Sequence, residues 1–497
     1  MDAHKAKRRG GSLGAGNRRS SARVTRRLVL AAPARLAVLV GTPLLAASCA
    51  RATPSGSSAP AAGGPSAGPA RGKITWLVRS QQIENDWEQQ VVLPAMRQQY
   101  PQLEIDLQIA PPDVAWNEKV FSLYAAGTPP DVHNGIVGTF IQLYAQGKLV
   151  ELTPLAARDR FDLKAFGGYE RDQDMCRSGK QWSLPILTTL GTMTFYNLDL
   201  LEQAGISPPP TSWTDRSWNF DRVIDIGRKT TRSWGQPDAI YGLLPYYSGI
   251  GMHAWAYLWD GDPFPKEFYT QGIARESTWT SPAVVEAMQF YQDLALKQQI
   301  MPRKGAPTRA FREGGAALWG TTGWNVSDLR EVTLFRWGIA PLPWKVTNRT
   351  LSYTDPVVIS KETKALDASW ALVKYLTGRE GQLAYSKATG RPPTRTDAFD
   401  PWLDQTLKLP GMALKSRDQL LEVVTGYLKN HVDNWAHYVV NAGPLQDVER
   451  DVDNKLLSGE AAPAPAMQDM KARMDAVLRE TYEQFKSSPL VRDTPCT

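Results

Sequence analysis

Hydrophobic positions in the first half of the chain alternate between two periods, which predict strands and helices in turn. Residues 73–80 (KITWLVRS) form a short β-branched stretch and residues 103–110 (LEIDLQIA) alternate apolar with polar side chains, so both predict strands. Residues 84–100 and 116–127 carry apolar side chains at helical spacing. Residues 128–135 (TPPDVHNG) predict a turn, a short strand and a loop. This β-α-β-α-β order indicates an α/β fold with a parallel sheet.

The second half of the chain is richer in helix. Apolar side chains at helical spacing predict helices over residues 281–299, 367–386, 418–430 and 465–485. Single hydrophobic cores rarely grow beyond about 250–300 residues, so a chain of 497 residues is expected to form two domains.

The carboxyl ends of the predicted parallel strands are the first candidate site. Ligands of open α/β sheets bind outside these ends. The ends fall at 79–81, 110–112 and 133–135. They place Gln81, Arg79 and Asn134 among the candidate polar contacts.

The charge of the chain is unevenly distributed. The formal net charge is +7, but of 57 basic and 50 acidic residues, ten basic and one acidic lie before Cys49, which leaves 47 basic against 49 acidic. The body of the protein is therefore close to neutral, and a nucleic-acid partner is not expected.

The basic front end predicts export. A Lys/Arg-rich stretch leads to TRRLVL at 25–30, and an apolar run then ends in AASC at Cys49. The paired arginines resemble a twin-arginine signal and AASC resembles a lipoprotein box, so residues 1–48 are predicted to be a cleaved signal and Cys49 a lipidated residue. The alternative is a transmembrane anchor over 28–48, which is long enough to span a bilayer but contains Arg35 and two prolines.

Residues 49–72 are rich in Pro, Gly, Ser and Ala, and this composition predicts a flexible tether. Beyond Cys49 only Cys176 and Cys496 remain; two cysteines so far apart give no disulfide framework and no zinc pattern, and whether they are free stays open. The five histidines are scattered. No metal site and no cofactor are expected.

Four further stretches, taken in order, resemble the extracellular solute-binding proteins of the carbohydrate type, which are partners of ABC importers. They lie within about residues 73 to 400, and it is their order and spacing that carry the resemblance. The stretches are AAGTPPDVHNG with YAQGKLVELTPL (125–135, 144–155), GKQWSLPILTTLGTMTFYNLDLLEQAGISPPPTSW (179–213), AFREGGAALWGTTGW (310–324) and the block from YTDPVV to GRPPTR (353–395).

The resemblance implies a periplasmic-binding-protein-like fold of two α/β lobes with the ligand in a cleft between them. The lobes are expected to close by hinge motion, and the closed form to dock on a membrane permease. Crossings between lobes are expected near 187–190, 308–311 and 343–355. The corresponding lobes are residues 73–188 with 311–345, and residues 189–310 with 355–497.

Sugar rings need flat aromatics to stack on and planar polar groups to bond their hydroxyls. Trp324 follows a predicted strand at 316–319 and a Gly-Thr-Thr-Gly turn, where the family places a stacking aromatic. The glycines of this loop are expected to let the backbone approach a ligand. Trp435 resembles the aromatic that the family projects from a late helix, and Tyr246 and Trp255 belong to an aromatic cluster that is expected to reach the cleft in part.

Most aromatic residues in any domain lie in its core, so the abundance of aromatics alone does not assign a ligand-binding role to these residues. The candidate polar contacts beside Gln81 and Asn134 are Thr188 and Asp355, at the first and last crossings, and Arg391, which could contact ligand or bridge the lobes.

The expected function is that of a surface-tethered, monomeric substrate-binding component of an ABC importer for a sugar, an oligosaccharide or a related polyol. One alternative is a secreted glycoside hydrolase with two carboxylates, although no local acid pair and no G-x-S-x-G motif stand out. Another is the same fold with a non-sugar ligand such as a peptide, a phosphorylated polyol or a metal complex.

Overall fold

The computed structural model describes residues 70–110, 114–136, 138–171, 175–246, 251–494 and 496. The predicted signal, Cys49 and the tether up to residue 69 lie outside the described residues.

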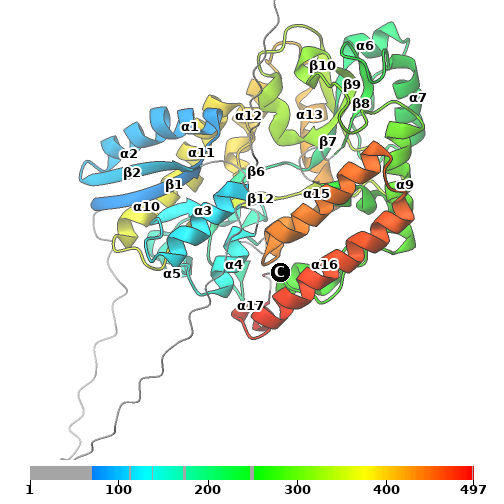
Figure 1. The fold of residues 1–497 in the computed structure, drawn as a ribbon. Helices are drawn as coiled ribbons and strands as arrows, with labels where there is room; N and C mark the ends of the chain where they lie inside the picture. Colours follow the sequence, from blue (N-terminus) through cyan, green and yellow to red (C-terminus); the bar gives the residue numbers. More distant parts are fainter. Residues whose placement is uncertain are drawn as a thin grey trace, which may run out of the picture. The chain divides into compact units, whose positions relative to one another are not determined.

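The first sheet has five strands in the order β2-β1-β3-β12-β6 (Figure 1). They are β1 (Gly72–Arg79), β2 (Leu103–Ala110), β3 (Val132–Asn134), β6 (Leu184–Thr188) and β12 (Thr354–Ile359). Strand β1 is parallel to β2 and β3, which confirms the predicted parallel arrangement, whereas β12 is antiparallel to β3 and β6. Alternation along β1 sends Trp76 and Val78 into one hydrophobic cluster and Leu77 into another on the opposite face.

The predicted helix between β1 and β2 contains a π turn. It comprises α1 (Gln82–Trp87), the π turn Glu88–Val92 and α2 (Leu93–Gln99). Pro94 follows this turn and has no N–H to donate, so regular i to i−4 bonding cannot continue through it.

The second sheet has four strands in the order β10-β7-β9-β8. They are β7 (Thr192–Asn197), β8 (Tyr241–Leu244), β9 (Ala316–Thr322) and β10 (Trp337–Ala340). The largest hydrophobic cluster surrounds this sheet and includes α7 (Phe220–Thr230), α9 (Pro282–Leu296), α15 (Ala442–Ser458) and α16 (Pro463–Phe485). We call the parts built on the two sheets the first lobe and the second lobe.

The remaining elements connect or cover the lobes. Short pairs are β4 (Cys176–Arg177) with β5 (Lys180–Gln181), and β11 (Thr350–Ser352) with β13 (His431–Asp433). The other helices are α3 (Val114–Ala125), α4 (Thr139–Ala145), α5 (Thr153–Asp159), α6 (Leu198–Gln203), α8 (Lys266–Gln271), α10 (Leu366–Thr377), α11 (Arg379–Thr389), α12 (Phe399–Thr406), α13 (Arg417–Thr425), α14 (Trp435–Tyr438) and α17 (Pro489–Arg492). The four helices predicted in the second half are confirmed, with a break at Gly378 between α10 and α11.

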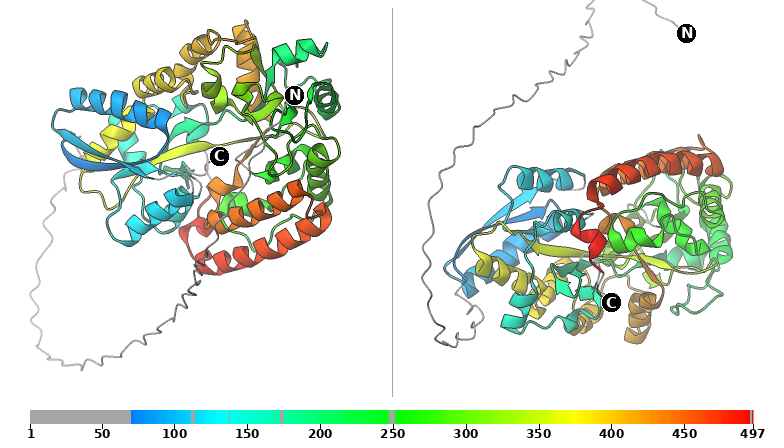
Figure 2. Two further views of the ribbon diagram at one scale, coloured as in Figure 1. Left: turned by 45° about the horizontal axis from the view of Figure 1, so that its top comes forward. Right: turned by 90° about the horizontal axis from the view of Figure 1, so that it is seen from below.

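Sheet pairing corrects the expected division into lobes. The chain passes between the sheets after β6 and again between β10 and β12, close to two of the expected crossings (Figure 2). No crossing occurs near 308–311, because β8 and β9 are neighbours in the second sheet. Residues 311–345 therefore belong with the second lobe, since β9 and β10 both pair with β7 there. Strand β12, expected in the second lobe, is instead in the first sheet between β3 and β6.

Cys176 and Cys496 form a disulfide, which answers the question that the sequence left open, whether these two cysteines are free. Their Cα atoms lie 5.5 Å apart although 320 residues separate them in the sequence. The spacing of the two cysteines along the chain gave no sign of the pair, because only the fold brings these distant residues together.

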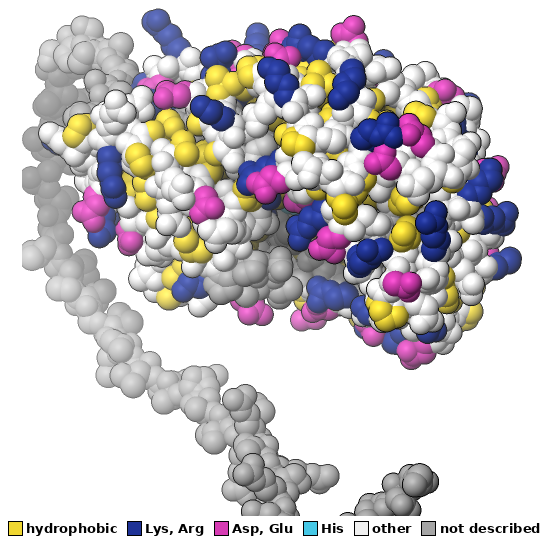
Figure 3. Space-filling model, turned by 90° about the horizontal axis from the view of Figure 1, so that it is seen from above, with side chains coloured by type: hydrophobic (Ala, Val, Ile, Leu, Met, Phe, Trp, Pro, Cys, Tyr) yellow, Lys and Arg dark blue, Asp and Glu magenta, His cyan; other side chains and the backbone are white. Residues whose placement is uncertain are grey.

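Two properties of the described residues bear on location and surface. None of the helices among them is both long and apolar enough to cross a membrane. On the face drawn in Figure 3, basic and acidic side chains are interspersed.

Candidate functional site

A buried group of charges lies where β1 ends. The guanidinium of Arg79, the last residue of β1, donates to both carboxylate oxygens of Glu84 at 3.0 Å and lies 3.4 Å from Asp355 Oδ2. Arg391 also donates to Glu84, and its second terminal nitrogen donates to Gln81 Oε1 at 3.2 Å. All four charged side chains are buried or nearly so. The structure thus brings three predicted residues, Gln81, Asp355 and Arg391, into one cluster.

Strand directions explain why these residues meet. Because β12 is antiparallel to both β3 and β6, the carboxyl ends of β1, β3 and β6 share one edge with the start of β12. Thr188 ends β6 and pairs with Thr354, next to Asp355. Asn134 ends β3 and pairs with Val357. The side chain of Asn134 is buried, and its Oδ1 has no hydrogen-bond partner among the described residues.

Trp324 reaches this edge from the second lobe. Strand β9 continues through Thr322, three residues further than predicted, and Trp324 lies in the 3-10 helix Gly323–Leu329 that follows. The backbone N–H of Trp324 donates to the carbonyl of Thr189 at 3.2 Å. The guanidinium carbons of Arg391 and Arg79 lie 4.0 and 5.2 Å from its ring centroid, within cation–π range. Arg391 therefore already occupies part of the half-buried indole surface that was predicted to stack on a ligand.

Burial and charge act in opposite directions on the acids of this cluster. Burial raises the pKa of Asp355 to about 6 even though Arg79 opposes it. Burial also disfavours ionised Glu84, but Arg79 and Arg391 outweigh it and hold the pKa of Glu84 below its ordinary value. Near neutral pH, two guanidinium groups therefore face two carboxylates, so the charges of the cluster balance.

Tyr246 and Trp255 belong to a separate cavity of about 400 Å³ in the second lobe. Glu449 and Asp453, one helical turn apart on α15, line the same cavity. Glu449 Oε1 accepts the backbone N–H of His253 at 2.8 Å. Burial raises the pKa of Asp453 to about 6. Neither acid was among the predicted site residues. Their four-residue spacing gave no signal, because residues 442–458 were not among the predicted helices.

Trp435 lies in the hydrophobic core of the second lobe. It is fully buried, and its ring centroid is 5.2 Å from that of Phe264 and 5.7 Å from that of His253. On the same short helix, His437 stacks on Tyr353 at 4.4 Å, and burial together with Arg79 lowers the pKa of His437 to about 3. Helix α14 thus connects the second-lobe core to the cluster, while a ligand role for Trp435 stays a prediction.

The described residues contain no group of three or more His, Cys, Asp or Glu side chains arranged to hold a metal ion.

Two α/β lobes joined by repeated chain crossings, with polar strand ends and an aromatic meeting at those crossings, define the class of two-lobed solute-binding proteins. The chain belongs to the bacterial extracellular solute-binding protein family, whose model matches residues 106–411.

Known relatives and solved structures agree with this class. The sn-glycerol-3-phosphate-binding periplasmic protein of Pectobacterium atrosepticum is 21% identical over 391 residues, covering 73% of this chain and 82% of that protein. The ABC substrate-binding protein Lmo0181 of Listeria monocytogenes, in complex with cycloalternan, superposes with a TM-score of 0.68 at 18% identity, over 83% of this chain and 99% of that chain. UgpB of Mycobacterium tuberculosis, in complex with glycerophosphocholine, superposes with a TM-score of 0.66 at 16% identity, over the same shares.

Proposed function

We propose that this protein is the surface-tethered substrate-binding component of an ABC importer. It captures a sugar, an oligosaccharide or a related polyol between its lobes by hinge closure and delivers it to a membrane permease. The observation that carries the proposal is the meeting of Gln81, Asn134, Thr188 and Asp355 along one edge of the first sheet with Trp324 from the second lobe. Aromatic and planar polar groups together suit a ring with hydroxyls on its rim.

The charge balance favours an uncharged ligand. Arg79 and Arg391 are already paired with Glu84 and Asp355, so the cluster carries no surplus of either sign. A buried polar atom without a partner is costly. Asn134 Oδ1 and Arg391 Nε are two atoms at this edge that have no hydrogen-bond partner in the part of the chain that the structure describes. Ligand hydroxyls can donate to the first atom and accept from the second.

A phosphorylated polyol is the second candidate, and the two arginines beside Trp324 favour it. Guanidinium groups bind phosphate with paired hydrogen bonds. Such a ligand would have to compete with Glu84 for both arginines. Two of the similar proteins are named for, or bound to, glycerol phosphates.

Export, anchoring and the extent of the lobes are part of the same proposal. A lipid on Cys49 after a twin-arginine-like signal would hold a monomer at the membrane through the tether. The disulfide supports an exported protein, because such bonds persist in oxidising compartments. From the sheet pairing we assign residues 70–188 and 354–395 to the first lobe, and residues 192–340 and 399–485 to the second.

A thermal-shift screen against sugars, oligosaccharides, polyols, sn-glycerol 3-phosphate and glycerophosphocholine tests the proposal. A ligand that binds only the folded state raises the melting temperature with its concentration; at 100 times its Kd, the stabilisation is about 2.7 kcal/mol. We expect at least one neutral sugar or polyol to do so and to be recovered unchanged.

Stabilisation by the phosphorylated compounds alone would establish the second candidate instead. Hydrolysis of a stabilising glycoside would contradict a pure binding role, and no stabilisation by any compound in the panel would contradict both ligand classes.

A further inference from the structure

The end of the chain passes from the second lobe to the first. Helix α16 packs in the second-lobe core, where Met467, Met470 and Met474 are fully buried. The last residue of α16, Phe485, lies in a hydrophobic cluster to which both lobes contribute. In the same cluster, Leu490 of α17 is fully buried with Phe140 and Ile141 of α4 in the first lobe. The described part of residues 486–496, which is 486–494 and 496, therefore forms a further connection between the lobes, apart from the crossings that flank the candidate site.

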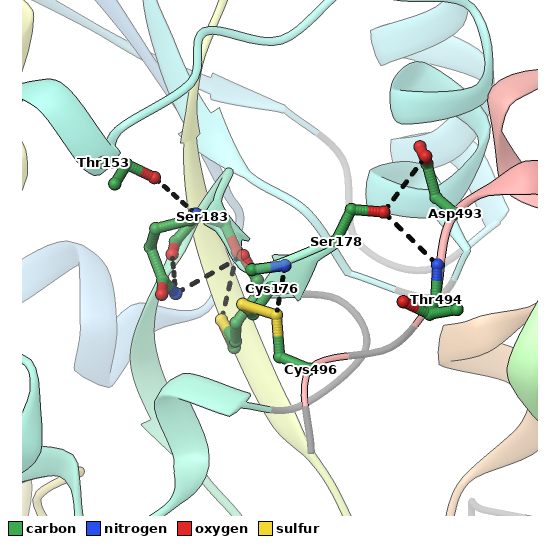
Figure 4. The surroundings of a disulfide bond; sticks show 10 residues. Thr153, Cys176, Ser178, Ser183, Asp493, Thr494 and Cys496 are labelled. Carbon is green, nitrogen blue, oxygen red and sulfur yellow. Dashed lines mark hydrogen bonds between the residues drawn. A yellow bond between two sulfur atoms is a disulfide. The ribbon is translucent and has the colours of Figure 1, made fainter.

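Figure 4 shows how this tail is fastened to the hairpin formed by β4 and β5. Cys496 is bonded to Cys176, the Ser178 N–H donates to the carbonyl of Thr494 at 2.7 Å, and Ser178 Oγ donates to Asp493 Oδ1 at 3.1 Å. The Tyr144 hydroxyl donates to the other oxygen of Asp493. The hairpin belongs to the first lobe, because Leu152 next to α5 donates its N–H to the carbonyl of Gln181.

We propose that residues 486–496 are a strap, locked by the Cys176–Cys496 disulfide, that limits how far the two lobes can open. The proposal rests on the proposed function insofar as the lobes are taken to move by hinge motion. Hydrogen bonds and a docked leucine can detach when the lobes separate, whereas a disulfide cannot.

The strap has little free length. A fully extended chain spans at most about 3.6 Å per residue, but a helical residue advances only about 1.5 Å. Four strap residues lie in α17, and Leu490 holds this helix in the cluster that α4 of the first lobe helps to form. With the disulfide intact, the lobes can move far apart only if α17 unwinds and Leu490 leaves its core.

Distance measurements between the lobes of the ligand-free protein test the strap. Spin labels are attached through azide-bearing residues at exposed Gln98 on α2 and exposed Lys229 on α7, so that no cysteine is added. Double electron–electron resonance then gives the distance distribution before and after reduction by dithiothreitol. Dithiothreitol reduces the Cys176–Cys496 disulfide to two thiols and is itself oxidised to a cyclic disulfide. We expect reduction to shift the distribution to longer distances and to broaden it.

The matched control is the C176S/C496S double variant. It should show the long, broad distribution without reductant and no change on adding it, and circular dichroism checks that it is folded. If the double variant does not fold, the reduction of the folded wild-type protein decides alone. An unchanged distribution on reduction would overturn the strap. Because no ligand is present, this outcome is independent of whether the ligand screen succeeds.

Discussion

Trp324 shows what the sequence could and could not determine at a single residue. The glycine-rich context placed it in a loop after a strand. The structure confirms that it follows strand β9, but places it in a 3-10 helix and not in a loop. The partners of its ring were not predictable. Arg79 and Arg391 both belong to the other lobe, and more than 300 residues separate these two arginines from each other in the sequence. A stacking ligand must share or displace Arg391, so Trp324 and Arg391 act as a pair.

Glu88 supplies a prediction at the same scale. Burial raises its pKa from an ordinary 4.5 to about 8, and Asn85 donates to its Oε2 at 2.8 Å. The pKa of Glu88 is higher in the folded state than in the unfolded state. Its contribution to the free energy of unfolding is therefore fully present below about pH 4.5 and is lost as the pH rises through about 8. Each pKa unit corresponds to about 1.4 kcal/mol.

The Glu88→Gln variant removes this titration and keeps an oxygen that can accept from Asn85. Urea titrations at pH 5, 7 and 9 measure the unfolding free energy of both proteins. We expect the difference, variant minus wild type, to rise by a few kcal/mol from pH 5 to pH 9, because only the wild type loses stability through Glu88. A constant difference between the two proteins across this range would show that Glu88 does not titrate with a raised pKa.

At the scale of elements, strand β9 shows why the loop glycines were misread. They were expected to let a ligand approach the backbone, but Gly320 lies within β9 and faces Tyr246. An added Cβ at Gly320 would lie 2.0 Å from Cδ1 and 2.5 Å from Cα of Tyr246. The close neighbour is therefore the core of the protein itself, which a local sequence pattern cannot distinguish from a ligand.

The Gly320→Ala variant is expected to lose about 1–3 kcal/mol of stability, because the buried Tyr246 has no room to move away. The control is Gly443→Ala near the start of α15, where no atom lies within 4 Å of an added Cβ. This control should leave stability unchanged or raise it by up to about 1 kcal/mol. Equal melting temperatures for Gly320→Ala and the wild type would contradict the packing described.

Local patterns predicted the elements better than they predicted the lobes. Strict alternation identified β2, and helical spacing identified α9 and α16. The assignment of β9 and β12 to lobes failed because a strand's sheet is decided by its partners, which are distant in sequence. The Cys176–Cys496 pair and the Glu449–Asp453 cavity became visible only through the fold for the same reason.

At the scale of the whole molecule, the two sheets and their crossings place polar strand ends opposite a second-lobe aromatic. The contacts of Trp324 with Thr189, Arg79 and Arg391 all join the second lobe to the crossing or to the first lobe. A ligand held between the lobes should therefore depend on Trp324 more than on other half-buried tryptophans. Trp234 is a suitable comparison, because it is also half-buried and has the Arg303 guanidinium 5.6 Å from its ring, but it packs within the second lobe.

Titration calorimetry of the strongest ligand from the screen tests the central claim most directly, with the wild type, Trp324→Ala and Trp234→Ala measured side by side. We expect Trp324→Ala to weaken binding about tenfold, as the loss of an aromatic stacking partner would. Trp234→Ala should bind as the wild type does. Equal affinity of the wild type and a folded Trp324→Ala variant would contradict binding of the ligand between the lobes at Trp324.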